Sequence, residues 1–274
     1  MTDQPGSPTD PIDYILRRKS RSVLEQVRTA LDTGNVALAF QPIVYATDID
    51  RPAFHEGLIR LIDTNGEVIP ARDFIDEVEM IELGRQIDTA ALRCGIEALI
   101  EHPALRLSIN MSARSIGYPE WMATLNKGLQ EEPTVAERLI LEITESSAIS
   151  MPEIVSYFMA DLHSRGISFA LDDFGAGYTA FRFFREFQFD IVKIDGLFSR
   201  DIANNPDNQV LMGALIAIAE QFDMFTVAEE VERQEDLDYL QQSGIRCVQG
   251  YITGVPDLSP IWRVSPEKRR GYAS

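Results

Sequence analysis

The stretch FALDDFGAGYTAFRFFREFQFDIVKID, residues 169–195, contains two short apolar runs, each of which leads into ionisable residues. The first run ends at Asp172 and Asp173, and the second carries Lys193. Runs of this length that are rich in Val, Ile, Leu and Phe are typical of buried strands. A carboxylate or an ammonium group at the end of such a strand indicates that the strand leads from the core into a polar site.

The same kind of run recurs along most of the chain. The apolar runs lie at 37–44, 53–62, 105–110, 138–144, 167–172, 189–194, 224–229 and 245–249. Most are followed by a stretch of helical period, such as 71–101, 152–165, 206–222 and 233–243. Strand then helix, repeated about eight times, predicts an α/β fold of the TIM-type (β/α)8 barrel class. The first two runs leave no room for a helix between them, so we expect a modified barrel with one antiparallel strand.

The bulk composition suits one large domain with an acidic surface. The chain has 274 residues, 45% of them hydrophobic, and a TIM-type barrel takes roughly 250 residues. The formal charge is −18, so neither a long nucleic acid nor a membrane is expected as a partner. No apolar run approaches the roughly 20 residues of a membrane helix. Cys94 and Cys247 lack any metal or disulfide spacing, so we expect reduced thiols in a cytoplasmic protein.

The two ends of the chain differ from its middle. Residues 1–12 are polar and rich in Pro, Gly, Ser and Asp, which predicts a disordered lead, and 13–33 have helical period. The last residues are basic and polar. We therefore divide the chain into an N-terminal tail and helix (1–30), a main domain (31–262) and a C-terminal tail (263–274).

Most of the predicted strands end in a polar or ionisable residue. These residues are Glu56, Asn110, Glu142, Asp172, Asp173, Lys193, Glu229 and Gln249. In a parallel barrel the carboxyl ends of the strands meet on one face, where the active site is built. The sequence therefore predicts a cluster of five carboxylates, two amides and one ammonium group at that face.

Such a cluster predicts bound metal ions. Five carboxylates packed together cannot all ionise unaided, and hard divalent cations with oxygen ligands resolve the repulsion. Because no His or Cys stands among these residues, Mg²⁺ or Mn²⁺ is favoured over zinc. The number of carboxylates favours two cations that share a bridging Asp, an arrangement suited to phosphoryl transfer. Any one of these residues alone is more often a salt-bridge partner or a loop cap. The histidines His55, His102 and His163 share no spacing and are not assigned to chemistry.

With these residues in place, the chain resembles the EAL domains of bacterial cyclic di-GMP phosphodiesterases. The resemblance runs from about Leu31 to Trp262. It is carried by FQPIV (40–44), EGLIR (56–60), SINMSARS (108–115), LEITES (141–146), DDFGAGY (172–178), VKID (192–195), VAEEVE (227–232) and VQGY (248–251). It implies hydrolysis of cyclic di-GMP to the linear dinucleotide pGpG, two divalent cations as cofactors, and a homodimer.

The resemblance also implies roles for single residues. Glu56, Asn110, Glu142 and Asp172 match ligands of one metal. Asp172 would bridge to a second metal, which Asp173 also binds. Lys193 resembles the residue that holds and activates the attacking water. Glu229 matches a carboxylate of the metal-and-water site, which an older view of the family makes the general base. Lys193, Glu229 and Glu56 are thus the expected catalytic group. Gln41, Arg60 and Gln249 are expected at the substrate, and Glu145 as the anchor of the 172–178 loop.

Three departures from the family pattern bear on function. Gly57 stands where Ala is usual, and its position should alternate away from the site, so we expect little effect. Glu230 replaces the usual Gly in VAEEVE, which adds a carboxylate and predicts strain in a tight turn. The segment 74–88 looks shorter than its counterpart, which concerns substrate affinity more than chemistry.

An alternative function is a catalytically inactive cyclic di-GMP receptor or protein-interaction module. Degenerate relatives usually lose strand-end carboxylates or the DDFG-type loop, and this chain keeps both. An active hydrolase is therefore the favoured interpretation. An unrelated metal-dependent barrel enzyme is a third possibility.

Overall fold

The computed structural model describes residues 11–175, 186–260, 262 and 263. Its strands are β1 (Val36–Tyr45), β2 (Asp48–Ile62), β3 (Val68–Pro70), β4 (Leu107–Asn110), β5 (Leu139–Thr144), β6 (Ser168–Phe174), β7 (Ile191–Ile194), β8 (Phe225–Ala228) and β9 (Cys247–Val248). Its helices are α1 (Pro11–Thr33), α2 (Ile75–Val78), α3 (Glu82–Glu101), α4 (Pro119–Glu131), α5 (Glu145–Ser150), α6 (Pro152–Ser164), α7 (Gly196–Ser199), α8 (Pro206–Gln221) and α9 (Gln234–Ser243).

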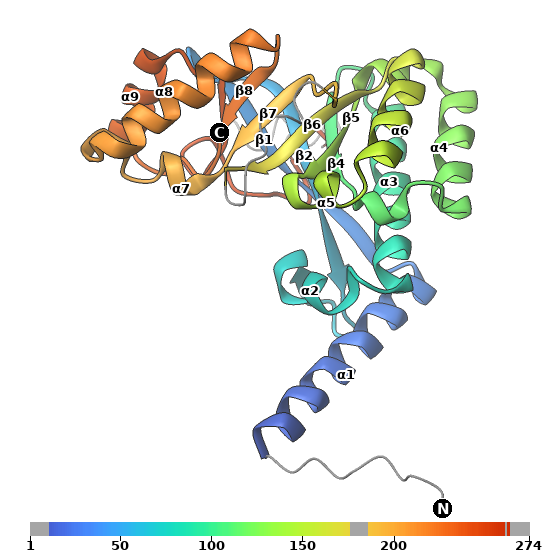
Figure 1. Cartoon of the computed structure of the whole chain (residues 1–274). Helices are drawn as coiled ribbons and strands as arrows, with labels where there is room; N and C mark the ends of the chain where they lie inside the picture. The colour runs from blue at the N-terminus through green and yellow to red at the C-terminus, as the bar shows by residue number, and fades with distance from the viewer. Residues whose placement is uncertain (1–10, 176–185, 261, 264–274) are drawn as a thin grey trace, which may run out of the picture.

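The strands form a closed barrel with one extra strand. They pair in the order β1-β9-β8-β7-β6-β5-β4-β2-β3, and β1 also pairs with β2, which closes the ring. From β2 through β4 to β9 the barrel neighbours are parallel, whereas β1 is antiparallel to both β2 and β9. Figure 1 shows α3, α4 and α6 on one side of these strands and α7, α8 and α9 on the other. The predicted modified TIM-type barrel with one antiparallel strand is confirmed.

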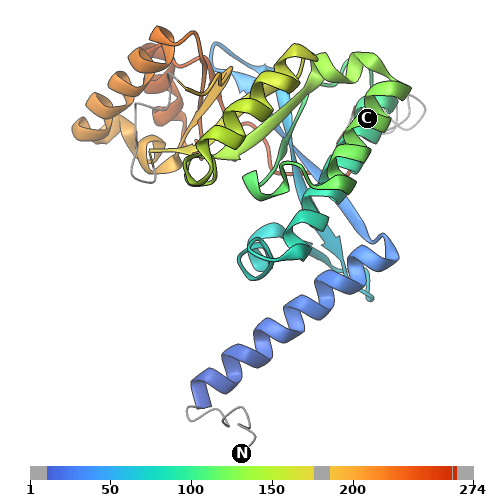
Figure 2. The ribbon, with the colours of Figure 1, turned by 45° about the vertical axis from the view of Figure 1, so that its right-hand side comes forward.

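The first hairpin extends beyond the barrel. The strands β1 and β2 pair in one register from Val36 opposite Leu61 to Ile43 opposite Phe54, and after two shifts the pairing ends with Tyr45 opposite Asp48. The outer end of the hairpin carries β3, α2 and the long helix α1, which projects from the body of the molecule (Figures 1 and 2). Helix α1 begins at Pro11, two residues earlier than the predicted 13–33. Residues 1–10 of the expected lead and the expected tail from 264 onward lie outside the described residues.

One predicted helix is divided in the structure. We expected helical period over 71–101, but the chain forms a 3-10 turn at Ala71–Asp73, then α2, and only then α3. The break at 79–81 brings the chain back against itself. A Cβ on Gly84 would lie 2.7 Å from the carbonyl oxygen of Val78, so only glycine fits this close approach. A single continuous helix was therefore wrong for this segment.

The core has two layers. Inside the barrel lies a small apolar cluster made of Ile43, Phe54, Ile140, Ala170, Ile191, Val227 and Cys247. A larger cluster fills the space between the strands and the surrounding helices. Alternate residues of each strand thus face the barrel interior or the helices. Among the described residues, no helix is both long enough and apolar enough to cross a membrane.

Candidate active site

The predicted strand-end residues meet at the carboxyl end of the barrel. Lys193 on β7 lies at the centre of the group and is 1% exposed. Its Nζ is 2.8 Å from Glu142 Oε2, 2.8 Å from Asp172 Oδ1, 3.0 Å from Glu229 Oε1 and 3.2 Å from Glu56 Oε2. These carboxylates come from β5, β6, β2 and the residue that follows β8. We refer to Lys193, these four residues and Asp173 as the acidic centre.

Three amide side chains tie the centre together. Asn110 Nδ2 donates to Glu56 Oε1 at 2.7 Å, and Gln249 Nε2 donates to Glu56 Oε2 at 2.7 Å. Gln249 Nε2 also lies 3.1 Å from Gln41 Oε1, and Gln41 Nε2 donates to the carbonyl of Gly254. Gln249 can contact both Gln41 and Glu56 because these two residues are directly opposite each other on β1 and β2. The amides therefore fix both oxygens of Glu56.

The centre resists full ionisation. Burial raises the pKa of Glu142 to about 8, and repulsion from Glu56 adds to it. Burial also raises the pKa of Glu229 well above its ordinary value. Burial alone would raise the pKa of Glu56 too, but attraction to Lys193 and hydrogen bonds from Gln249 and Asn110 bring it below the ordinary range. Burial would lower the pKa of Lys193, yet attraction to the carboxylates raises it well above normal, so Lys193 is charged.

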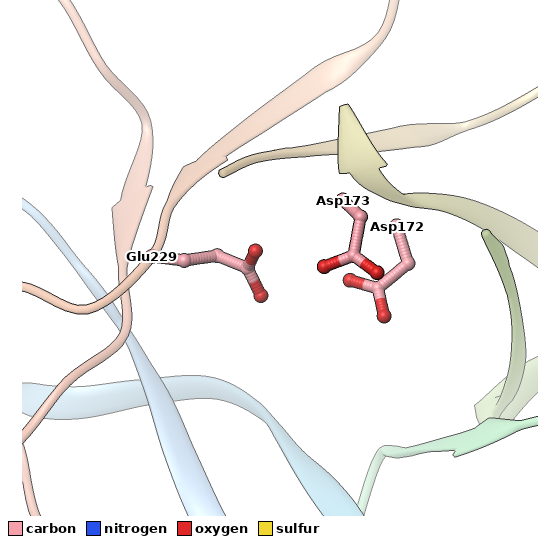
Figure 3. A group of neighbouring side chains, drawn as sticks. All are labelled: Asp172, Asp173 and Glu229. Atoms are coloured by element: carbon pink, nitrogen blue, oxygen red, sulfur yellow. The ribbon is translucent and has the colours of Figure 1, made fainter. Parts of the chain in front are cut away.

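Asp172, Asp173 and Glu229 form the part of the centre most suited to a metal ion. One carboxylate oxygen from each lies within 4.8 Å of the other two. Figure 3 shows Glu229 facing the two aspartates from across the barrel mouth. Asp173 reaches this position with φ of 54°, a left-handed conformation that costs a non-glycine residue on the order of 1 kcal/mol. Burial and the neighbouring Asp172 raise the pKa of Asp173 to about 6.

Spare oxygen atoms in the centre also fit a cation. Glu142 Oε1 and Gln249 Oε1 are buried, and neither has a hydrogen-bond partner among the described residues. The donor set consists of carboxylate and amide oxygens, which Mg²⁺ and Mn²⁺ prefer. Five carboxylates and one ammonium leave four formal negative charges, the number that two divalent cations would neutralise. The residues present therefore fit the predicted metal group.

Two cavities flank the acidic centre. One, of about 400 Å³, is lined by Gln41, Arg60, Arg72, Arg200, Glu230 and Tyr251 among others, and we call it the arginine cavity. The other, of about 600 Å³, lies between β2, α3, β4 and α5 and is mostly apolar; we call it the apolar cavity. Glu229 and Gln249 reach the first, and Asn110 reaches the second. Leu58 and Ala71 line both cavities.

Three residues at these cavities were not identified from sequence. Arg72 and Arg200 line the arginine cavity, but an arginine in a loop carries no sequence signal that separates a pocket from the surface. Asp88 in α3 lines the apolar cavity, where burial raises its pKa to about 7. It accepts hydrogen bonds from Ser112 N at 2.9 Å and Ser115 Oγ at 2.6 Å, which holds the loop after Asn110. The sequence did contain a signal for Asp88, because a carboxylate at an apolar position of a helix indicates a buried polar contact.

The remaining sequence expectations fall at or near the mouth. Glu145 Oε2 accepts a hydrogen bond from Gly175 N at 3.3 Å, where the described part of the 172–178 loop ends. Residues 176–178 lie outside the described residues. Glu230 has φ of 55°, so this position does adopt the left-handed conformation in which Gly is favoured. His55 points away from the centre and accepts a hydrogen bond from Trp262 Nε1 at 3.2 Å.

Comparison with known proteins agrees with this geometry. The family model described as EAL domain matches residues 24–256. The "Probable cyclic di-GMP phosphodiesterase PdeA" of Escherichia coli is 30% identical over 238 residues, which is 85% of this chain and 32% of that protein. The "Cyclic di-GMP phosphodiesterase PdeB" of Shewanella oneidensis is 31% identical over 235 residues, which is 84% of this chain and 28% of that protein. The chain thus spans about a third of the length of these relatives.

A solved structure shows the same fold. The FimX EAL domain from Pseudomonas aeruginosa, described as bound to c-di-GMP, matches with a TM-score of 0.78 and 26% sequence identity. The match covers 86% of this chain and 96% of that one.

Proposed function

Because this chain belongs to the EAL domain family, we propose that it hydrolyses cyclic di-GMP to linear pGpG with two divalent cations, Mg²⁺ or Mn²⁺. The observation that carries the proposal is the complete acidic centre. A buried ammonium contacts four carboxylates, and a fifth, Asp173, stands at the open side. A protein that only binds the dinucleotide gains nothing from keeping so many mutually repelling groups together.

The metal ligands would be Glu56, Asn110, Glu142, Asp172, Asp173 and Glu229. The spare oxygen of Glu142 and the grouping of Asp172, Asp173 and Glu229 support this assignment. Bound divalent cations would neutralise these carboxylates, make a water molecule more acidic and offset charge on the phosphate. The protein's share is to hold the ligand oxygens in place, which the amides of Asn110 and Gln249 do for Glu56.

Lys193 and Glu229 are the residues placed to handle the attacking water. Lys193 stays charged and lies in hydrogen-bond reach of Glu229, so it can orient a water and stabilise its developing negative charge. Glu229 reaches the arginine cavity and lies beside the charged Lys193, which favours its ionised form, and as a carboxylate it can accept the proton. The attack breaks one phosphodiester bond, and the 3′ oxygen of the ribose leaves as a hydroxyl group.

The two cavities support a substrate with two halves. Cyclic di-GMP carries two guanosines on one ring, and the two cavities adjoin the centre through Asn110 on one side and Glu229 and Gln249 on the other. Gln41, Arg60 and Gln249 line the arginine cavity and are the proposed substrate contacts. Arg60 offers a guanidinium group for a phosphate or for the edge of a guanine. Glu145 would hold the start of the 172–178 loop beside this substrate through Gly175.

The competing function is binding without cleavage. The FimX structure is described only as bound to c-di-GMP, and that observation suits a receptor as well as an enzyme. The complete acidic centre favours the enzyme, because recognition of the dinucleotide alone does not need two metal ions.

The test is incubation of the purified chain with cyclic di-GMP and Mg²⁺, Mn²⁺ or EDTA, with chromatographic detection of pGpG. We expect product with either metal and none in EDTA. Glu56→Ala should abolish product, whereas Glu131→Ala, an exposed carboxylate on α4, should not. Intact substrate that binds but is never cleaved would establish the receptor instead.

We also propose a homodimer in the cytoplasm. Ile154 and Tyr157 on α6 are 50% and 80% exposed, which supports an apolar contact with a second copy. Cys94 and Cys247 are both free thiols, which suits a reducing compartment. Light scattering after size exclusion tests the dimer, and a monomer at micromolar concentration would contradict it. The boundaries 1–30, 31–262 and 263–274 stay predictions.

A further inference from the structure

One ion pair in the arginine cavity has no part in the roles assigned above. Arg200 Nη2 lies 2.5 Å from Glu230 Oε2, and both residues line the cavity. Arg200 directly follows the short helix α7, and α7 comes directly after strand β7, which carries Lys193. Glu230 directly follows Glu229 of the acidic centre. The pair is therefore built on the same two strand ends as two of the catalytic side chains.

The local backbone is shaped to allow this pair. Glu230 adopts φ of 55°, which is unfavourable for a residue with a side chain. A Cβ on Gly196 would collide with the carboxylate of Glu230, so the glycine leaves the space in which that carboxylate lies. Strain of this kind persists where the surroundings favour it, and it gathers at functional sites. A glycine at 196 and a strained glutamate at 230 together place Arg200 at the cavity.

The cavity brings three arginines together in an acidic protein. The chain has 25 basic and 43 acidic residues, yet Arg60, Arg72 and Arg200 line this one cavity beside Glu229, Glu230 and Glu232. Arg60 on β2 lies directly opposite Pro70 of β3, two residues before Arg72. Arg60 and Arg72 come from β2 and the turn after β3, whereas Arg200 comes from the opposite side, beyond β1, β9 and β8. A ligand in the cavity thus has arginines on two walls.

We propose that Arg200, held by Glu230, binds the phosphate of the cyclic dinucleotide that is not being cleaved. This inference rests on the proposed function, because it takes the other phosphate to be at the acidic centre. The second phosphate carries a negative charge of its own, with which a guanidinium group at the cavity can form a charge-assisted hydrogen bond. A guanidinium retains further donors after pairing with one carboxylate. The pair would therefore favour a ring with two phosphates over a simple phosphodiester.

The test compares two substrates. Arg200→Met should raise KM for cyclic di-GMP about tenfold and leave kcat within about twofold, because a charge-assisted contact made in ground and transition state alike is lost. The same variant should leave metal-dependent hydrolysis of bis(p-nitrophenyl) phosphate unchanged, since that substrate has one phosphate. Arg28→Met, an exposed arginine on α1, is the matched control and should change neither reaction.

Two more variants separate phosphate binding from a structural role. Arg200→Lys keeps the charge and should recover part of the affinity. Glu230→Gly removes the partner and relieves the strained backbone, so it should raise KM for cyclic di-GMP while leaving the folded protein at least as stable in thermal unfolding. Equal losses on both substrates, or no change in KM in Arg200→Met, would overturn the proposal.

Failure of the proposed function is distinguishable from failure of this inference. If the wild type cleaves cyclic di-GMP and Arg200→Met behaves like it, the enzyme stands and the inference falls. If the wild type cleaves neither substrate, titration calorimetry with cyclic di-GMP takes the place of KM. A Kd that weakens about tenfold in Arg200→Met and not in Arg28→Met would then support the contact, and equal affinities or absent binding would refute it.

Discussion

The two ends of this barrel are built from opposite chemistry. At the carboxyl end, Lys193 and five acidic residues crowd together, and Asp173 and Glu230 hold left-handed backbone. Toward the amino end, on the outer face of β1 and β2, Trp262 packs edge-on against Phe40, His55 and His102, with ring centroids 4.9, 5.4 and 5.1 Å apart, and we call these four rings the aromatic cluster. There the polar atoms are satisfied in pairs, such as Trp262 Nε1 on His55.

The acidic centre serves function at a cost in stability, whereas the aromatic cluster around Trp262 contributes stability. The mouth holds groups whose pKa values are shifted by their neighbours, and it depends on ions outside the chain to balance its charge. The aromatic cluster around Trp262 is stabilised by burial of its rings, and it does not depend on bound ions. In barrels of this class, residues at the carboxyl ends of strands serve chemistry and those at the amino ends serve stability. Substitutions at the two ends should therefore act on different quantities.

The largest effect is expected at the mouth. Lys193→Met should lower kcat roughly 10²–10⁴-fold, because it removes the group that orients and stabilises the attacking water. Without metal it should also reduce the free energy of unfolding by about 3–5 kcal/mol, since the buried carboxylates lose their cation. Steady-state pGpG formation and urea unfolding in EDTA measure the two losses.

The matched control is Lys127→Met, an exposed lysine on α4. A Lys193→Met protein that keeps kcat would remove Lys193 from the chemistry, whatever happens to its stability.

The next largest effect is expected in the aromatic cluster around Trp262. Trp262→Ala should lower the free energy of unfolding by about 2 kcal/mol, because a half-buried ring leaves its aromatic neighbours exposed. The folded variant should keep kcat within about twofold, since Trp262 packs on the outer face of β1 and β2 and the acidic centre lies on their inner face. Chemical denaturation with a parallel assay at low temperature tests both parts. A large fall in kcat in folded protein would mean that the two ends are coupled.

The contribution of the aromatic cluster to stability should also depend on pH, through His55. Burial lowers the pKa of His55 from its ordinary 6.5 to about 4. Between pH 6.5 and about 4 the unfolded chain takes up a proton that the folded chain does not, so His55 makes the fold less stable as pH falls. Relative to His55→Gln, which still accepts from Trp262, the wild type should lose about 2 kcal/mol from pH 7 to 5. Equal pH profiles of unfolding would show that His55 does not titrate in this window.

The smallest effect is expected between the two ends. A Cβ on Gly57 would lie 2.7 Å from Ile109 Cδ1, and the same side chain fills the space beside Gly95. Gly57→Ala should therefore cost about 1 kcal/mol of stability through overpacking and leave kcat unchanged, because the Cβ points toward the helix layer. Ile109→Val added to this variant should recover stability, and thermal unfolding measures both. A fall in kcat would contradict the expectation that this position faces away from the site.

Much of the fold and of the site was predictable because both follow local patterns. Apolar runs ending in Glu56, Asn110, Glu142, Asp172, Lys193 and Glu229 indicated strands and a shared end, since parallel strands bring their carboxyl ends together. The antiparallel pairing of β1 and β2 follows from two adjacent runs with no room for a helix, whereas the register that puts Gln41 opposite Glu56 comes from the structure. The break at 79–81 was missed, because helical period continues across it and only the close approach at Gly84 prevents the helix.

By itself, the sequence determined which elements form and which residue types gather at the mouth, because period and chain order carry that information. The tertiary structure alone decided three further things. It put Lys193 within 3.2 Å of four carboxylates, it turned Arg72 and Arg200 toward one cavity, and it set the carboxylate of Glu230 over Gly196. These contacts join residues far apart in the chain, and their distances depend on barrel closure and on side-chain packing, which no local pattern encodes.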